Sequence, residues 1–335
     1  MSTSFGLQTK GLSTGYRDRK RGERIISKDL NVSIAPGELV MFMGPNGSGK
    51  STLMHTIAGL LPPISGEVLI GGESVAKQSI GQIAKMLSLV LTERITSATM
   101  TVEDVVSIGR YPHIGYLGKL SEYDHKLVAE AIELCNLRGM EQRTLSELSD
   151  GERQRTMIAR ALAQQTPLIL LDEPTAHLDL PSRLDVILML RRLAHDMKRS
   201  ILVSTHELDL ALSWADTIWL LDREGRLTTG APEDLVLAGS VEKTFGNEWL
   251  GYDSEAGEFV TRLAKSKVIH LEAEGLSYIW TKRALGRIGY DLATDKQPDT
   301  LSVQVKDGVW HLAQGSVHHT ASCIKDLVTL INTIT

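Results

Sequence analysis

Two carboxylates directly follow a run of aliphatic residues in the stretch LILLDEPTAHLD, residues 168–179. Residues 168–171 predict a fully buried strand, and Asp172 and Glu173 come at its end. Burying a carboxylate carries a large cost in free energy unless a cation or hydrogen bonds offset it. We therefore expect this strand end to face a cation or another polar ligand.

A second stretch, GPNGSGKS at residues 44–51, fits the pattern G-x-x-x-x-G-K-[ST]. The apolar run ELVMFM precedes it and a helical pattern over residues 52–60 follows it, which is the context that the pattern requires. Such a loop binds phosphate oxygens with its backbone N–H groups at the N-terminus of a helix. We expect Lys50 to reach the β- and γ-phosphates and the Ser51 hydroxyl to bind Mg²⁺. The alternative, a glycine-rich turn with a chance lysine, is disfavoured by the flanking strand and helix.

The phosphate loop accounts for the two carboxylates. In P-loop folds a neighbouring strand carries an aspartate that helps to hold Mg²⁺, and Asp172 fits that role. Glu173 is one residue further on, points elsewhere and could accept a proton from an attacking water. The alternative, two acids that cap a surface loop, is disfavoured because the sequence also contains a phosphate loop.

The composition is that of a globular protein, with 42% hydrophobic and 23% charged residues. A chain of 335 residues favours one large domain plus a smaller one. The net charge of −5 gives no reason to expect nucleic acid as a partner. Cys135 and Cys323 are too few for a disulfide framework, which indicates a reducing compartment. We find no signal peptide and no run approaching the ~18 apolar residues of a membrane span, so we expect any membrane role to come through a partner.

Strands and helices alternate through most of the chain. Residues 1–43 are rich in strand patterns and residues 101–165 in helical ones. Strands are then expected at 168–171, 200–205 and 217–222, with helices at 182–196 and 207–214 between them. This alternation predicts a doubly wound, mainly parallel sheet. After residue 250 the pattern changes to strand, helix, strand, a hairpin around Asp307-Gly308, and a final helix.

These motifs together resemble those of the ATP-binding subunits of ABC transporters, over residues 5 to about 240. LSDGERQRTMIARAL at 148–162 is similar to the signature LSGGQ, and AHLD at 176–179 is similar to the D-loop. His206 in LVSTHE resembles the switch histidine, and Tyr16 in LSTGY matches the aromatic residue that stacks on adenine. The motifs occur in the family's order. Their spacing leaves no room for the long coiled coil of chromosome-maintenance ATPases.

The resemblance implies an α/β fold of the P-loop NTPase class. A mainly parallel core sheet, an antiparallel β-subdomain and a helical subdomain at about 93–166 would form an ATP-binding domain over residues 1–245. Residues 250–335 would form a small C-terminal α+β domain of unknown role. Packing against the ATPase core and regulation both remain open for it.

The resemblance also implies that two subunits enclose two ATP molecules head to tail. Lys50, Glu173 and His206 would be catalytic, with Glu173 as general base and His206 holding the γ-phosphate. Ser149 and Gly151 would contact the γ-phosphate bound to the opposite subunit, and Asp179 would couple the two sites. The full nucleotide-binding set would be Tyr16, Gly44, Pro45, Asn46, Gly47, Ser48, Gly49, Lys50, Ser51, Thr52, Ser149, Gly151 and Asp179.

Two positions depart from the family pattern. Thr92, in LVLTER, stands where the family has a glutamine that touches Mg²⁺ and couples to the membrane subunit. Because threonine is shorter, the neighbouring Glu93 could substitute, and the predicted metal ligands are therefore Ser51, Asp172 and one of Thr92 or Glu93. The signature reads LSDGE, and we expect Asp150 to point away from phosphate.

The stretch VVSIGRYPHIGYLG, residues 105–118, resembles the helical subdomain of importers for iron–siderophore, haem and cobalamin. The alternative is a loop that happens to contain an arginine and a tyrosine. The implied function is an ATP-hydrolysing subunit that drives uptake of a metal chelate across the inner membrane, lying peripherally on its cytoplasmic face. The implied partners are a second copy, integral membrane permease subunits and, indirectly, a substrate-binding protein, with no nucleic acid.

A soluble ABC-type ATPase acting in translation or repair is the alternative function. Such proteins usually carry two nucleotide domains or an inserted coiled coil, and neither pattern is found in this sequence. A P-loop kinase would leave the signature and D-loop motifs unexplained. The histidines at 113, 125, 318 and 319 lack partners at metal-ligand spacing, so we expect surface or structural roles for them.

Overall fold

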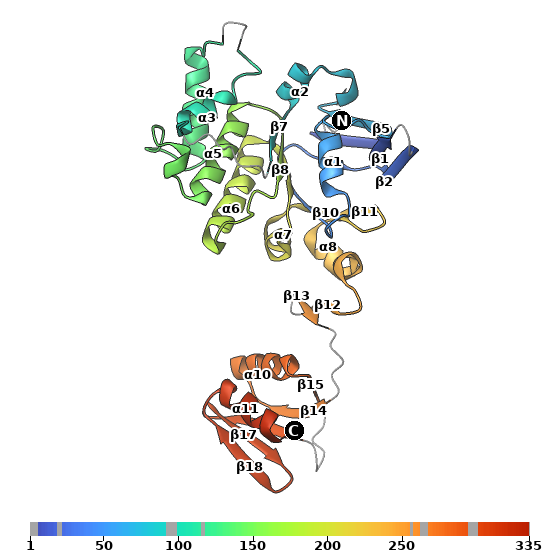
Figure 1. Cartoon of the computed structure of the whole chain (residues 1–335), viewed down its shortest axis with the longest axis vertical. Helices are drawn as coiled ribbons and strands as arrows, with labels where there is room; N and C mark the ends of the chain where they lie inside the picture. Colours follow the sequence, from blue (N-terminus) through green and yellow to red (C-terminus); the bar gives the residue numbers. More distant parts are fainter. Residues whose placement is uncertain are drawn as a thin grey trace. The chain divides into compact units, whose positions relative to one another are not determined.

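The computed structural model describes residues 6–18, 22–91, 99–114, 118–254, 257–261, 267–293 and 301–334. The chain divides into two compact units (Figure 1). The first comprises Met1–Asn247 and Tyr252–Phe259, and the second comprises Glu248–Gly251 and Val260–Thr335. Thr92 and Glu93, the two alternatives for a metal ligand, lie outside the described residues.

The first unit is built on a sheet with the strand order β11-β10-β4-β9-β8-β7. All neighbouring pairs are parallel except β10 and β11, which are antiparallel. This confirms the predicted mainly parallel core sheet of a P-loop fold. The strands are β4 (Leu39–Met43), β7 (Leu87–Val90), β8 (Leu168–Asp172), β9 (Ser200–Ser204), β10 (Thr217–Leu221) and β11 (Leu227–Gly230).

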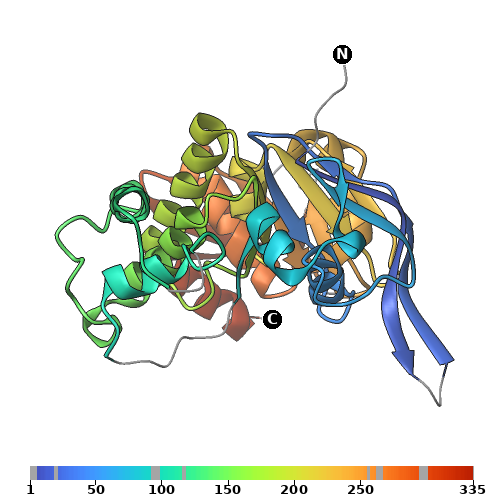
Figure 2. The same cartoon turned by 90° about the horizontal axis from the view of Figure 1, so that it is seen from above.

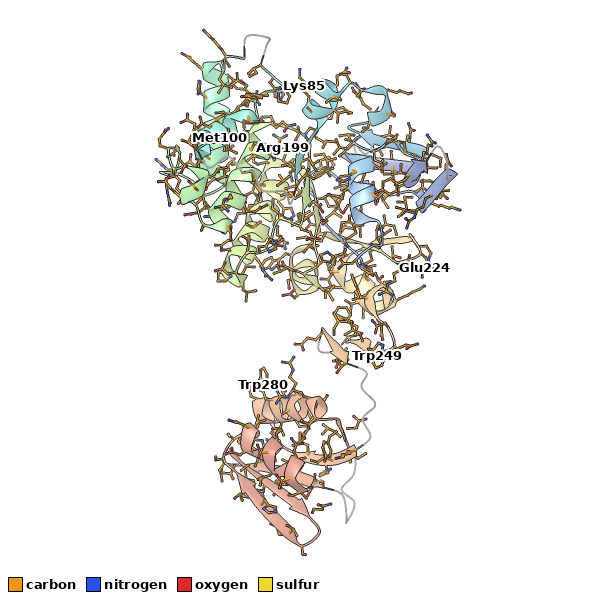
Figure 3. All side chains as sticks on the ribbon, in the orientation of Figure 1. Lys85, Met100, Arg199, Glu224, Trp249 and Trp280 are labelled. Atoms are coloured by element: carbon orange, nitrogen blue, oxygen red, sulfur yellow. The ribbon has the colours of Figure 1, made fainter. Side chains whose placement is uncertain are left out.

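The core strands are nearly continuous aliphatic runs because apolar side chains cover both faces of the sheet. β4 and β9 are buried along their whole length. Side chains also fix the strand ends. Arg199, labelled in Figure 3, donates to the carbonyl of Thr166 at 2.8 Å and to the side chain of Gln165 at 3.0 Å. These bonds tie the start of β9 to the segment that leads into β8.

An antiparallel β-subdomain precedes and flanks the first helix. It contains β1 (Leu7–Asp18), β2 (Gly22–Leu30), β3 (Ser33–Ile34), β5 (Ser65–Ile70) and β6 (Glu73–Ser74). Figure 2 shows the ribbon of β1 and β2 projecting from the first unit. Arg17 and Glu23 form a cross-strand ion pair of 2.9 Å near its tip. The described residues of the basic stretch, 16–18 and 22–24, therefore lie on this ribbon. Nearby are α1 (Lys50–Ile57), η1 (Val75–Lys77) and α2 (Ile80–Met86).

The helical subdomain is formed by α3 (Val102–Ile108), α4 (Glu122–Leu134), η2 (Leu145–Glu147) and α5 (Asp150–Ala163). Each of the three α-helices starts at a capping box, in which the N-cap side chain and the acid three residues later bond each other's backbone N–H groups. The N-caps are Thr101, Ser121 and Ser149. Their apolar faces join the same buried cluster as one face of the core sheet. The predicted helical content of residues 101–165 is confirmed.

Four further helices of the described chain follow the strands β8 to β11: α6 (Leu180–Met197), α7 (Leu208–Trp214), α8 (Pro232–Leu237) and α9 (Ser240–Phe245). α6 begins two residues before the predicted position because Asp179 caps it, accepting a hydrogen bond from Ser182 N, and Pro181 suits its first turn. β12 (Leu250–Asp253) and β13 (Glu258–Thr261) then form a two-stranded sheet.

The second unit is an α+β fold with the strand order β15-β14-β16-β17-β18. Its elements are β14 (Lys267–Glu272), α10 (Gly275–Arg287), β15 (Tyr290–Leu292), β16 (Ser302–Lys306), β17 (Val309–Gln314), β18 (Val317–Ala321) and α11 (Ile324–Ile334). Asp307 and Gly308 both have positive φ, as a two-residue hairpin turn requires, and β16 and β17 pair across them. The predicted strand–helix–strand, hairpin and final helix are confirmed.

None of the helices in the described part of the chain combines the length and the apolar character that a membrane span needs.

Candidate functional site

A glycine-rich loop joins β4 to α1 and forms the base of the candidate site. Gly49, the N-cap of α1, has a φ of 106°, a conformation that strains any residue with a side chain. A Cβ atom on Gly44 would lie 2.3 Å from the carbonyl oxygen of Leu221, at the end of β10. Both positions therefore require glycine, and the loop has the tight backbone path of a phosphate-binding loop.

Lys50 turns its side chain back over this loop. Its Nζ donates to the carbonyl of Gly44 at 2.7 Å and to that of Pro45 at 3.3 Å. Burial lowers the pKa of Lys50 below its ordinary value, and the charges of Glu173 and Asp172 oppose that shift. The ammonium group is thus buried between the loop and two carboxylates, where it can neutralise phosphate charge.

Asp172 and Glu173 lie where β8 ends, and Ser204 at the end of β9 holds both. The Ser204 hydroxyl donates to Asp172 Oδ1 at 2.5 Å. The backbone N–H of Glu173 donates to Ser204 Oγ and to the Ser204 carbonyl, both at 3.1 Å. Glu173 has a φ of 48°, which is uncommon for a residue with a side chain and clusters at functional sites. The two adjacent carboxylates have different partners: Asp172 accepts from Ser204, and Glu173 pairs with His206.

His206 forms a pair with Glu173. Its Nε2 lies 2.7 Å from Glu173 Oε1, and both side chains keep about a third or more of their surface exposed, at 42% and 34%. A carboxylate bonded to an imidazole and open to solvent can orient a water molecule and accept its proton. The structure therefore brings together Glu173 and His206, two of the three predicted catalytic residues. Burial lowers the pKa of Lys50, the third of them, and the charge of Glu173 opposes that shift.

Glu207 links the segment after His206 to the segment after Glu173. Its carboxylate accepts a hydrogen bond from Thr175 Oγ1 at 3.0 Å and pairs with Arg183 Nη1 at 3.0 Å. Arg183 Nε also donates to the Leu178 carbonyl at 2.7 Å. This cluster holds the loop with Asp179 beside the loop with His206. Sequence reasoning missed Glu207 and Arg183, although the position of Glu207 next to His206 was a usable signal.

Asp179 is exposed and caps α6 through its bond from Ser182 N. A hydrogen bond from the Ser182 side chain is the main cause that lowers the pKa of Asp179, followed by the bond from the Ser182 backbone, and both favour the ionised carboxylate. It lies at the surface of the first unit, where a second molecule can reach it.

The signature residues lie at the start of α5. Ser149 Oγ accepts the N–H of Glu152 at 3.2 Å, and hydrogen bonds from Ser149 lower the pKa of Glu152 below its ordinary value. Gly151 is buried, and a Cβ atom there would lie 3.2 Å from Ser182 Oγ. Asp150 pairs with Arg153 of the same helix at 3.0 Å. A helix N-terminus with a serine hydroxyl and a glycine is suited to an anion.

Tyr16 on β1 reaches the phosphate-loop helix from the β-subdomain. Its hydroxyl lies 3.1 Å from Thr52 Oγ1, and its side chain is 48% exposed. An exposed aromatic ring beside the start of α1 is available to stack on the base of a nucleotide whose phosphates occupy the loop.

The groups around α1 fit a nucleoside triphosphate with Mg²⁺. Ser51 is exposed directly after the buried Lys50, and Ser48 Oγ is buried with no hydrogen-bond partner among the described residues. Mg²⁺ at such sites is held by one or two carboxylates, phosphate oxygens and water rather than by a cage of protein ligands. Asp172 can supply such a carboxylate, and the Ser51 hydroxyl can supply a further oxygen atom. Clusters of three or more His, Cys, Asp or Glu that could form a metal cage are absent from the described residues.

Comparison with known proteins finds two family models that match this chain. The model described as "ABC transporter" matches residues 27–176, and the one described as "Iron ABC transporter C-terminal domain" matches residues 265–332. The first covers the phosphate loop, the signature and the two carboxylates at the end of β8. The second covers most of the second unit.

Two curated relatives are similar over most of their length. An uncharacterized ABC transporter ATP-binding protein of Methanocaldococcus jannaschii is 37% identical over 253 residues, covering 76% of this chain and 86% of that protein. The iron(3+)-hydroxamate import ATP-binding protein of Bacillus subtilis is 34% identical over 239 residues, covering 71% and 87%. Among solved structures, the dimeric structure of a bacterial ABC transporter cassette matches with a TM-score of 0.58 and 26% identity, covering 68% of this chain and 98% of that one.

Proposed function

The chain belongs to the ATP-binding subunits of ABC transporters, and we propose that it drives the import of a metal chelate. Membership of this family makes the chain an ATPase whose hydrolysis of ATP powers transport. The family's subunits work as dimers attached to membrane permeases. The identity of the cargo and the roles of single residues are the proposed part.

The second family model is the observation that carries the proposal for the cargo. Its description refers to iron ABC transporters, and it matches residues 265–332, outside the ATPase motifs. The names of three relatives support a metal chelate as the cargo. These relatives are described as import ATP-binding proteins for iron(3+)-hydroxamate, petrobactin and cobalamin. The GRYPH stretch adds a resemblance to the same importers. The alternative of a soluble ATPase in translation or repair gains no support from these relatives.

In the proposed reaction, Lys50 neutralises the β- and γ-phosphates while Glu173 takes a proton from the attacking water. His206 orients the Glu173 carboxylate across their 2.7 Å contact and holds the γ-phosphate. Mg²⁺, when bound through Ser51 and Asp172, would neutralise charge that develops on the phosphate oxygens. Tyr16 stacks on adenine.

The active form would be a head-to-tail dimer. Ser149 and Gly151 of one copy would contact the γ-phosphate held by the Lys50 loop of the other, and Asp179 would couple the two sites. The dimeric structure of a similar cassette supports the pairing of two copies. We further propose attachment to permease subunits at the cytoplasmic face of the inner membrane, with a substrate-binding protein as an indirect partner. The division into an ATP-binding domain at 1–245 and a C-terminal domain at 250–335 is part of the same proposal.

Uptake in cells tests the cargo. The gene would be deleted in its source organism, and entry of a ferric hydroxamate, a ferric catecholate, haem and cobalamin, each radiolabelled, would be measured. Loss of uptake of one class, restored by the wild-type gene but not by a Glu173→Gln gene, is the expected result. Normal uptake of all four labelled compounds would overturn the metal-chelate proposal.

A further inference from the structure

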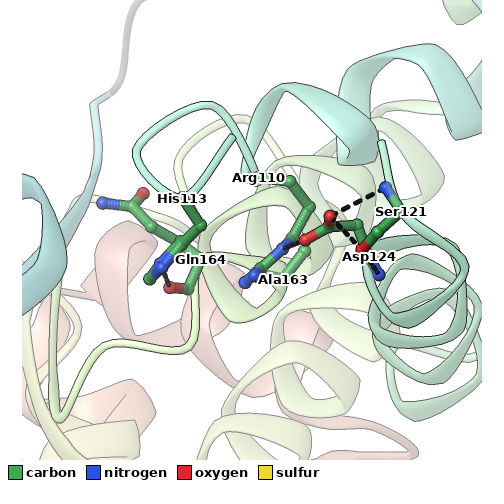
Figure 4. A network of polar contacts seen from close by, with 6 residues as sticks. All are labelled: Arg110, His113, Ser121, Asp124, Ala163 and Gln164. Carbon is green, nitrogen blue, oxygen red and sulfur yellow. Dashed lines mark hydrogen bonds and ion pairs between the residues drawn. The ribbon is translucent and has the colours of Figure 1, made fainter. Parts of the chain in front are cut away.

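The stretch GRYPH, residues 109–113, lies against the C-terminal end of α5 (Figure 4). A Cβ atom on Gly109 would lie 2.2 Å from the carbonyl oxygen of Arg160, in the last turn of α5. That carbonyl belongs to the backbone and cannot move aside cheaply. Gly109 is therefore required for the close approach of α3 to α5, and its φ is an ordinary helical one.

Arg110 bonds the end of α5 and the start of α4 with one guanidinium group. Nη1 donates to the Ala163 carbonyl at 2.7 Å and Nε donates to Asp124 Oδ1 at 2.8 Å. Arg110 is 4% exposed and Asp124 is 7% exposed. The other carboxylate oxygen of Asp124 accepts from the backbone N–H and the hydroxyl of Ser121, at 2.9 and 2.6 Å. Figure 4 shows this chain of contacts running from Ser121 through Asp124 to Arg110.

His113 bonds the next carbonyl along. Its Nε2 lies 2.8 Å from the carbonyl oxygen of Gln164, the C-cap of α5. The last carbonyls of a helix have no partner within the helix. Here two of them are satisfied by side chains of the GRYPH stretch, and the positive charge of Arg110 suits the negative end of the helix.

The same helix end is also bonded to the core sheet. The side-chain amide of Gln164 donates to the carbonyls of Ala84 and Leu87 at 2.6 and 3.0 Å. The hydroxyl of Thr166 donates to Ser88 Oγ at 3.0 Å. The C-terminal end of α5 is therefore a junction between the helical subdomain and the edge strand β7.

We propose that Gly109, Arg110 and His113 clamp the C-terminal end of α5 and thereby position Ser149 and Gly151 at its other end for the ATP of the partner subunit. They act as positioning residues and touch no substrate. α5 has 14 residues and spans ~21 Å, so a change of tilt at the clamped end moves the signature. The proposal rests on the head-to-tail dimer put forward above.

The test uses the full chain with Glu173→Gln, so that ATP remains bound. The dimer fraction at rising MgATP would be measured by analytical ultracentrifugation, and MgADP binding to the same proteins by calorimetry. His113→Ala and the double variant Arg110→Met/Asp124→Asn remove the clamp, and the double variant leaves no buried charge unpaired. His113→Gln restores a donor, and Lys126→Ala alters an exposed residue of α4 as the matched control.

We expect the clamp variants to need about tenfold more MgATP for half-dimerisation, the change expected when one or two helix-end hydrogen bonds are lost. Their MgADP affinity should match that of the parent within about twofold, since the phosphate loop is untouched. His113→Gln and Lys126→Ala should behave like the parent.

Three outcomes would overturn the proposal. Unchanged dimerisation in both clamp variants would mean that the stretch does not position the signature. An equal loss of MgADP affinity and dimerisation would mean that it acts only through general stability. Absence of any MgATP-dependent dimer in the Glu173→Gln parent would reject the head-to-tail site first, and the clamp with it.

Discussion

Replacing Glu173 by glutamine isolates the proposed general base. The amide oxygen of glutamine can still accept a hydrogen bond from His206 Nε2, so the 2.7 Å contact can persist. The backbone N–H of residue 173 donates both hydrogen bonds to Ser204, and these do not depend on its side chain. The substitution therefore removes charge and basicity while it leaves the geometry in place.

The size of the effect follows from the role. General-base catalysis contributes ~10²–10⁴-fold to a rate, and cleavage of bound ATP should slow by that factor. This corresponds to about 3–5 kcal/mol in the barrier. Lys50 loses one of the two carboxylates that oppose the effect of burial on its pKa, so its pKa should fall further.

Single-turnover cleavage of γ-labelled ATP, with nucleotide binding measured on the same protein, would check this. Asp172→Asn is the matched comparison, since it also turns a carboxylate into an amide one residue away. It should weaken MgATP binding, whereas Glu173→Gln should retain it. Cleavage by Glu173→Gln at a rate near that of the wild type would refute the reasoning.

Three other expectations can be checked with simple assays. Arg183→Met and Glu207→Gln should each lower the maximal ATPase rate with little change in KM. Because the two residues form one cluster, the loss of transition-state stabilisation in the double variant should be smaller than the sum of the two single losses. Fully additive losses would contradict this. Hydrogen bonds from Ser121, with a smaller contribution from Arg110, lower the pKa of Asp124 from its ordinary value to about 2. Its ionisation should therefore stabilise the fold above pH 4 by about 2 kcal/mol, a contribution lost as the pH falls toward 2. The free energy of unfolding in urea should therefore differ between Asp124→Asn and wild type at pH 7, and the two values should converge in acid. Cys323 is exposed, whereas burial raises the pKa of Cys135 to about 12; a thiol reagent at neutral pH should label one cysteine in the native chain and two after unfolding.

Contiguous motifs made most of the site predictable from the sequence. The residues of the phosphate loop, Asp172 and Glu173 follow strand ends, and a parallel sheet brings such ends to one edge. The Asp307-Gly308 turn was predictable because only a few residue types accept positive φ at both positions.

Contacts between distant segments could not be predicted in this way. Ser204, which holds both carboxylates, is an ordinary strand residue in the sequence. The bond from Arg183 to Glu207 depends on where α6 begins relative to β9, and no local pattern encodes that. The GRYPH stretch suggested a class of importer, but its contacts with the carbonyls of α5 became visible only in the fold.

Mixing two inactive variants tests the shared site most directly. Lys50→Ala removes the phosphate-loop charge, and Ser149→Arg blocks the signature, so each variant alone should be inactive. In a head-to-tail dimer of one copy of each, the intact Lys50 of one chain faces the intact Ser149 of the other, and one complete site is restored. If the subunits mix at random, about a quarter of the wild-type ATPase rate should return. No recovery from a mixture shown to contain mixed dimers would contradict the shared site.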